Sequence, residues 1–213
     1  MRTVLIIGAS KGIGLETARL ALKAGHSVRA LSRSATAIRL DDPKLEKLDG
    51  DALDRDMIDR TLVGVDAVIQ TLGVSPAPEL IFSGTRLFSA ATRVLVNAME
   101  ASGVRRLICV TGFGAGDSRG RGGLLYNAAF CLFLGRVYAD KDVQERIIRR
   151  SRLEWTIVRP TILTNGPHTG AYRVLVDPRD WSSGLIARAD VADFLVKQID
   201  DASLLHKTPT LTG

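Results

Sequence analysis

Short apolar runs recur along the chain and alternate with stretches of helical periodicity. The runs are rich in β-branched residues, as expected for strands that are covered on both faces of a parallel sheet. They predict strands at residues 3–7, 27–31, 45–48, 66–72, 106–111 and 155–159. Amphipathic patterns between them predict a helix that ends at Gly25, one that Asp54 caps, one over 86–102 and one that begins at Tyr138. This alternation predicts an α/β fold with a doubly wound parallel sheet, the Rossmann fold.

The pattern becomes less regular after residue 160. Turn-forming and polar residues fill 161–168, and short strands are expected at 171–176 and 185–186. Asp190 is expected to cap a helix that runs to about Gln198, and 208–211 reads as an edge strand. We therefore expect residues 1–213 to form one domain, in which residues 161–187 make a small substrate-covering part.

The first strand runs directly into a glycine-rich turn, G-A-S-K-G-I-G at residues 8–14. If a dinucleotide lies across this turn, Gly8 permits the sharp exit from the strand, and Gly12 lets the backbone approach the pyrophosphate. Gly14 then lets the following helix pack closely against the strand, and the free N–H groups of its first turn face the phosphates. Ser10, Lys11 and Ile13 of the same turn are further candidate cofactor contacts. An empty structural turn is the alternative.

The end of the second strand is where a dinucleotide-binding fold selects between NAD and NADP. An acidic residue about 20 positions beyond the glycine turn accepts hydrogen bonds from the ribose 2′-OH of NAD, whereas an arginine suits the 2′-phosphate of NADP. Arg33 occupies this region, Ser32 precedes it, and no Asp or Glu lies between residues 27 and 40. The sequence therefore favours NADP(H) over NAD(H), with an ordinary exposed arginine as the other interpretation.

Further cofactor contacts are expected where other strands end, because ligands of open α/β sheets bind outside the carboxyl ends of the strands. Asp51 is a candidate partner of the adenine amino group, although it could equally be a simple cap. The remaining candidates are Ala52 after the third strand, Thr71, Leu72 and Gly73 after the fourth, Thr111 after the fifth, and Pro160 and Ile162 after the sixth.

Four hydroxyl or amine side chains are candidates for chemistry. Thr111 and Thr161 end crevice strands and could orient a substrate. Tyr138 and Lys141 are three positions apart, hence on one helix face, where an ammonium beside a phenol favours the phenolate and can anchor ribose hydroxyls. The alternative is structural: Lys141 pairs with Glu145, and Tyr138 is a half-buried aromatic. His168, alone in a loop, is expected to be exposed.

Composition narrows the remaining classes. The formal charge of +6 is scattered along the chain without a nucleic-acid motif, so no nucleic-acid partner is expected. The two cysteines, Cys109 and Cys131, lie in apolar surroundings and are expected to be buried thiols, with no metal site. The first apolar run is too short for a signal peptide or membrane span, so we expect a cytoplasmic protein without a membrane partner.

Residues 117–137 change character from a polar, glycine-rich segment to a densely apolar run, L-L-Y-N-A-A-F-C-L-F-L at 124–134. The segment follows a crevice strand, which favours a lid or an oligomer contact over a plain core helix. A homodimer or a regulatory protein partner is therefore an open expectation.

Three stretches carry a resemblance to a known family. They are the Gly8–Gly14 turn with Arg33, residues 91–111 within the run AATRVLVNAMEASGVRRLICVT, and residues 141–160, KDVQERIIRRSRLEWTIVRP. They resemble the NAD(P)H-binding, NmrA-like atypical short-chain dehydrogenase/reductases. Within these, TGAY at 169–172 makes the chain similar to the biliverdin reductase B/flavin reductase group. The Tyr-x-x-x-Lys of the compact dehydrogenases is absent, and Thr111 and Thr161 stand where the flavin reductase group carries Ser and His.

The residues and the resemblance together predict an NADPH-dependent oxidoreductase that passes hydride to a small planar acceptor, a flavin such as FMN or a quinone. Flavin reduction depends chiefly on positioning the two rings, so it tolerates the loss of the histidine. Two alternatives stay open: a non-catalytic NADP(H)-sensing regulator of NmrA type, and a sugar-nucleotide epimerase or dehydratase.

Overall fold

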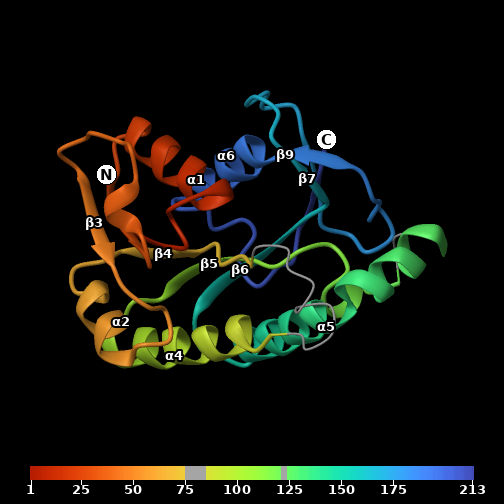
Figure 1. Ribbon diagram of the computed structural model, residues 1–213, viewed down its shortest axis with the longest axis horizontal. Helices are drawn as coiled ribbons and strands as arrows, with labels where there is room; N and C mark the ends of the chain where they lie inside the picture. Colours follow the sequence, from red (N-terminus) through yellow and green to blue (C-terminus); the bar gives the residue numbers. More distant parts are fainter. Residues whose placement is uncertain (75–84, 121–123) are drawn as a thin grey trace.

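The computed structural model describes residues 1–74, 85–120 and 124–213, with the side chains of 124–134 left out of the description (Figure 1). The Pro-rich segment that begins at Ser75 therefore lies outside the described residues. So do residues 121–123 of the predicted lid.

Parallel strands form the centre of the molecule. The main sheet has eight strands in the order β3-β2-β1-β4-β5-β6-β10-β8. Their bounds are β1 Thr3–Ile7, β2 Ser27–Ser32, β3 Leu45–Asp49, β4 Ala67–Gln70, β5 Arg106–Val110, β6 Glu154–Pro160, β8 Arg173–Leu175 and β10 Thr210–Thr212. All neighbours pair in parallel except β10 and β8. The strand order reverses beside β1, so the crevice between β1 and β4 is the expected ligand position.

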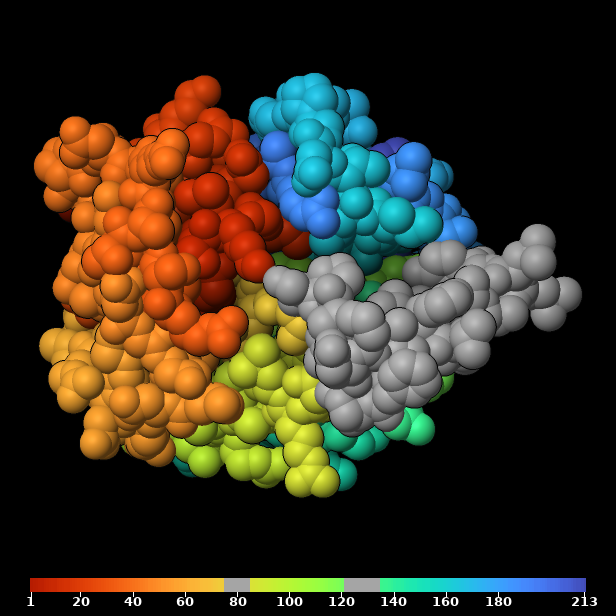
Figure 2. Space-filling view, in the orientation of Figure 1, coloured from red at the N-terminus to blue at the C-terminus, as the bar shows by residue number. Residues whose placement is uncertain are grey.

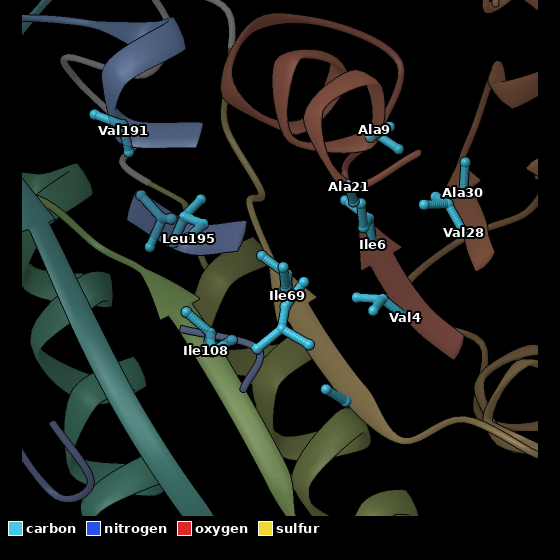
Figure 3. Close-up of a cluster of buried hydrophobic side chains, with 14 of the residues drawn as sticks. Val4, Ile6, Ala9, Ala21, Val28, Ala30, Ile69, Ile108, Val191 and Leu195 are labelled. Atoms are coloured by element: carbon cyan, nitrogen blue, oxygen red, sulfur yellow. The ribbon is translucent and has the colours of Figure 1, made fainter. Parts of the chain in front are cut away.

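Helices cover both faces of this sheet. The helices α1 (Gly12–Lys23) and α6 (Arg188–Lys197) lie on one face, and α2 (Arg55–Leu62), α4 (Leu87–Ser102) and α5 (Leu124–Arg149) lie on the other (Figure 1). Successive strand residues alternate between the two cores. Val4 and Ile6 face α1 and α6 (Figure 3). Leu5 and Ile7 belong to the core under the second group of helices. The doubly wound fold predicted from the apolar runs is confirmed.

Two short 3-10 turns and a small second sheet complete the architecture. The turns are η1 (Ala35–Ala37) after β2 and η2 (Gly116–Ser118) after β5. The small sheet pairs β7 (Ile162–Thr164) in parallel with β9 (Leu185–Ala187), so residues 161–187 return toward the main sheet. The two short strands expected after residue 170 are present as β8 and β9.

Three expectations about element ends were wrong. The helix that carries Tyr138 begins at Leu124 instead, because the apolar run before it continues the same helix. The strand near 208–211 is not an edge strand, since β10 lies between β6 and β8. The N-cap of α6 is Ala187, and Asp190 instead accepts hydrogen bonds from the backbone N–H groups of Thr169 and Gly170.

No helix among the described residues is long and apolar enough to cross a membrane. Of the segment 117–137, the structure describes Asp117 and Ser118 in η2, and it places the backbone of 124–137 in α5. Ser118 is buried and its hydroxyl donates to the Ala115 carbonyl oxygen at 2.6 Å. The lid and oligomer-contact interpretations of this segment stay predictions.

Candidate functional site

The glycine turn joins β1 to α1 at the carboxyl edge of the sheet. Gly8 has φ +89°, and a Cβ there would lie 2.9 Å from the Thr71 carbonyl oxygen. A Cβ on Gly14 would overlap the Gly8 carbonyl oxygen and lie 2.6 Å from Thr71 Oγ1. These positions accept only glycine, because the helix, the turn and the end of β4 approach one another without room for a methyl group. The turn thus has the close packing that the sequence predicts for Gly8 and Gly14.

The first turn of α1 is open to an anion. Its N-cap Lys11 makes no side-chain cap hydrogen bond, and its first turn contains no acidic residue. Gly12 has φ +58°, Ser10 and Ile13 are partly buried, and Lys11 is exposed. Unsatisfied N–H groups at a helix start carry partial positive charge and bind phosphate well. The residues present therefore fit the pyrophosphate of a dinucleotide.

Arg33 follows directly after β2 at the same edge of the sheet. Its side chain is exposed and makes no hydrogen bond or ion pair with the described residues. Ser32 is partly buried, and its hydroxyl oxygen accepts from the Ser34 N–H at 3.3 Å. A guanidinium at this strand end is available to a phosphate, as the choice of NADP(H) over NAD(H) requires.

Asp51 and Ala52 follow β3 beside this edge. Asp51 is exposed, and its Oδ1 accepts from the Leu53 N–H at 3.0 Å, which closes a local turn. Its Oδ2 can still accept a hydrogen bond from a ligand. Ala52 is buried. Asp54 caps α2 as predicted, accepting from the N–H groups of Asp56 and Met57. The adenine contact of Asp51 stays a prediction.

The end of β4 lies directly against the glycine turn. The Thr71 N–H and hydroxyl both donate to the Ile7 carbonyl oxygen, at 2.8 and 3.0 Å. Leu72 is partly buried against the α2–α4 core, and Gly73 is exposed. In the space-filling view, the red N-terminal segment, the yellow segment and the cyan and blue segments meet around a recess (Figure 2). The predicted contacts of β1 and β4 therefore share one surface.

Three of the four candidate catalytic residues meet at the tip of β5. The Lys141 ammonium donates to the Thr111 carbonyl oxygen at 2.8 Å and lies 4.1 Å from the centre of the Phe88 ring. Tyr138 reaches the next residue, since a Cβ on Gly112 would overlap its hydroxyl. Burial lowers the pKa of Lys141 to about 8, against the opposing charges of neighbouring groups such as Glu145. An ammonium with a lowered pKa and a phenol thus lie at the same strand end.

The neighbouring residue, Asp140, holds the start of α4. Its Oδ2 accepts from the backbone N–H groups of Phe88 and Ser89 at 2.9 and 3.2 Å. Consecutive residues of α5 therefore bind two different elements: Asp140 binds the first turn of α4, and Lys141 binds the tip of β5.

A buried ion pair between Glu145 and Arg159 adjoins this cluster, and the sequence did not predict it. Glu145 accepts from the Thr111 hydroxyl at 2.9 Å and from Arg159 Nε and Nη2 at 2.9 and 2.5 Å. Arg159 is 0% and Glu145 1% exposed, and Arg159 also pairs with Asp117 at 2.5 Å. The structural alternative from the sequence paired Glu145 with Lys141 on the same helix. The cation hydrogen-bonded to Glu145 is instead Arg159 on β6, a partner that no local pattern indicates, and Arg149 lies 3.7 Å away.

The fourth candidate, Thr161, stands apart from the other three. Its hydroxyl donates to the Leu211 carbonyl oxygen at 3.1 Å and its N–H donates to the same oxygen at 3.0 Å, so both groups bind β10. Pro160 is buried at the end of β6, and its carbonyl oxygen accepts from the Phe113 N–H. Ile162 is 48% exposed. The structure therefore brings Thr111, Tyr138 and Lys141 together and ties Thr161 to the sheet.

The predicted substrate-side loops are held against α6. Thr169 and Gly170 donate to Asp190, whose pKa is lowered because these hydrogen bonds outweigh burial. The Tyr172 hydroxyl donates to Asp193 at 2.7 Å. His168 is exposed as expected, 3.4 Å from Asp193. The TGAY stretch thus serves to attach this loop to the helix.

The structure describes the side chain of one of the two cysteines, Cys109. Cys109 is buried as expected, and Cys131 lies outside the described side chains. Among the described residues, no group of three or more His, Cys, Asp or Glu side chains could hold a metal ion.

The comparison with known proteins agrees with this geometry. The model of a family described as NAD(P)H-binding matches residues 8–202, which include the glycine turn, Arg33 and the β5 tip. The chain belongs to this NAD(P)H-binding family. The match extends from the glycine turn after β1 through α6, so the dinucleotide fold accounts for most of the chain.

Individual relatives are more distant. An uncharacterized chloroplastic protein of Arabidopsis thaliana is 29% identical over 208 residues, covering 93% of this chain and 72% of the relative. An uncharacterized sugar epimerase of Bacillus subtilis is 26% identical over 216 residues, covering 98% and 93%. The structure of ChuY from Escherichia coli O157:H7, an anaerobillin reductase, is 26% identical with a TM-score of 0.79, covering 99% of this chain and 96% of ChuY.

These similarities confirm the resemblance to the biliverdin-reductase-like group of atypical short-chain dehydrogenase/reductases. At the level of function they support an oxidoreductase or epimerase-like NAD(P)H-binding protein. The narrower NmrA-like assignment, the flavin acceptor and the cytoplasmic location stay predictions.

Proposed function

We propose that the protein is an NADPH-dependent reductase that passes hydride to a small planar acceptor, such as FMN or a quinone. The observation that carries the cofactor part is the combination of the helix start at Gly12–Gly14 with the Arg33 guanidinium at the adjacent strand end, which has no partner among the described residues. The first binds a diphosphate and the second binds the 2′-phosphate. When bound, the nicotinamide supplies the hydride.

The proposed role of the β5 tip is to hold the reacting groups. Lys141 holds the Thr111 carbonyl oxygen, and Glu145 holds the Thr111 hydroxyl, so the strand end is fixed from two sides. Tyr138 lies beside Gly112, so a phenolic proton donor stands at this tip together with the Lys141 ammonium. Hydride transfer to a conjugated ring depends mainly on such positioning, and a buried amine can reprotonate a neighbouring phenol. The similarity to an anaerobillin reductase supports a conjugated acceptor for this chain as well.

Anaerobic stopped-flow with NADPH and either FMN or a quinone tests the reductase. We expect oxidation of NADPH well above the uncatalysed rate, and Arg33→Glu should lower the preference for NADPH over NADH by about tenfold to a hundredfold, since a charged hydrogen bond contributes about 1.5–3 kcal/mol. Arg93→Glu makes the same charge change at an exposed site on α4 and should leave the preference unchanged. Absence of oxidation above the uncatalysed rate refutes the reductase.

The same experiment separates two other functions. A sensing regulator binds NADPH without oxidising it in the presence of any acceptor. An epimerase, which the Bacillus subtilis relative favours, returns its hydride and produces no net oxidation of NADPH while interconverting a sugar nucleotide.

A further inference from the structure

We propose that Arg188, the first residue of α6, binds the cofactor diphosphate together with the glycine turn. This inference rests on the proposed nucleotide site and assigns it a cation from a distant part of the chain. The decisive contact is between Arg188 and Gly12: a Cβ on Gly12 would lie 3.8 Å from both Cδ and Nε of Arg188. The guanidinium therefore stands over the first residue of α1.

The surroundings leave room for a ligand. A pocket of about 430 Å³ lies between α1, α6 and the loop after β7. Its lining includes Gly12 of the glycine turn, Arg188, and the loop residues Asn165 and His168. The pocket therefore opens beside the helix start at which a diphosphate is expected.

Asn165 orients the Arg188 side chain, and no acidic group among the described residues pairs with its charge. Its Nη1 donates to Asn165 Oδ1 at 2.7 Å, and within the described residues it makes no ion pair. One hydrogen bond fixes the plane of the guanidinium and leaves its other N–H donors for a phosphate. Arg19, which lines the same pocket, is instead paired with Glu16 at 2.7 Å. Arg188 is thus the arginine of this pocket that is available to an anion.

The position of Arg188 in its own helix is unfavourable without such an anion. A cation at a helix start is repelled by the partial positive charge there, and Arg188 also faces the start of α1, which has no acidic residue in its first turn. Asp190 in the same turn of α6 is occupied by Thr169 and Gly170. A diphosphate between α1 and Arg188 would compensate both helix starts.

Calorimetric titration of NADP⁺ and of NAD⁺ tests the assignment. Both dinucleotides carry the diphosphate, and only NADP⁺ carries the 2′-phosphate. We expect Arg188→Met to weaken both affinities by the same factor, about tenfold, which corresponds to the lower end for a charged hydrogen bond. Arg33→Glu should weaken mainly NADP⁺. Arg93→Met makes the same change at an exposed site on α4, away from this pocket, and should bind both dinucleotides like the wild type.

The outcomes are distinguishable. If the wild type binds neither dinucleotide, the proposed function fails; if it binds and Arg188→Met binds equally well, only the role of Arg188 fails. A loss confined to NADP⁺, or an equal loss in Arg93→Met, also overturns it. Thermal melting without ligand shows whether the variant is folded, and we expect a melting temperature no lower than that of the wild type. If Arg188→Met does not fold, Asn165→Ala replaces it, with a smaller loss expected equally for both dinucleotides.

Discussion

Replacing Glu145 by Ala should destabilise the protein strongly, because Glu145 joins three elements from a fully buried position. Its carboxylate accepts from Thr111 on the tip of β5 and from two nitrogens of Arg159 on β6. Removal leaves the Arg159 guanidinium, which is 0% exposed, with Asp117 as its remaining acidic partner. Breaking one side of a buried ion pair costs about 3–5 kcal/mol, since an uncompensated charge stays buried.

Asp117 still pairs with Arg159 after the change. The expected loss of unfolding free energy is therefore near the lower end of this range, about 3 kcal/mol. Because a domain of this size loses roughly 2–4 °C per kcal/mol, the melting temperature should fall by about 10 °C. Urea denaturation is the more direct assay: the midpoint should fall while the slope stays constant.

Asp59→Asn is the control for this experiment. Asp59 pairs with Arg55 at 2.7 Å on the surface of α2, with both side chains more than 40% exposed. Such a pair contributes about 0.5 kcal/mol or less. A loss in Glu145→Ala no greater than in Asp59→Asn would refute the view that the buried pair stabilises the β5 tip.

Three further predictions concern single positions. Gly14→Ala should abolish measurable NADPH binding in calorimetry, because its Cβ would overlap the Gly8 carbonyl oxygen, whereas Gly135→Ala, with no atom of the described residues within 4 Å, should bind normally. Relative to Lys141→Met, the wild type should gain up to about 3 kcal/mol of stability as the pH rises from about 8 to 10.5, because over this range the unfolded Lys141 still holds a proton that the folded one has lost; equal pH dependence of the two proteins in urea denaturation would contradict the lowered pKa. Asp54→Ala should cost about 1 kcal/mol in thermal unfolding, since the α2 cap is lost, and no change would argue against the cap.

The fold could be predicted from the sequence because its signals are local. The β-branched runs specify buried parallel strands, and the glycine spacing at 8–14 specifies the turn between β1 and α1. The position of β10 in the sheet could not be predicted, because a strand of three residues gives no periodicity. Its pairing with the end of β6 depends on contacts between residues far apart in the sequence.

The candidate site was predictable to the same extent. Thr111, Tyr138 and Lys141 were found because strand ends and helix faces follow from periodicity. The partner of Glu145 was missed, since side chains on β6 and α5 meet only through the packing of the whole sheet. Arg188 was missed for the same reason: its proximity to Gly12 depends on how α6 packs beside α1.

The adjacent hydrogen bonds of Asp140 and Lys141 have a mechanical consequence. One holds the beginning of α4 and the other the end of β5, and the two residues are joined by a single peptide bond. A rotation of α5 about its axis therefore displaces both side chains at once. A ligand that shifts the tip of β5 acts on Lys141 and, through the adjacent residue Asp140, on the first turn of α4.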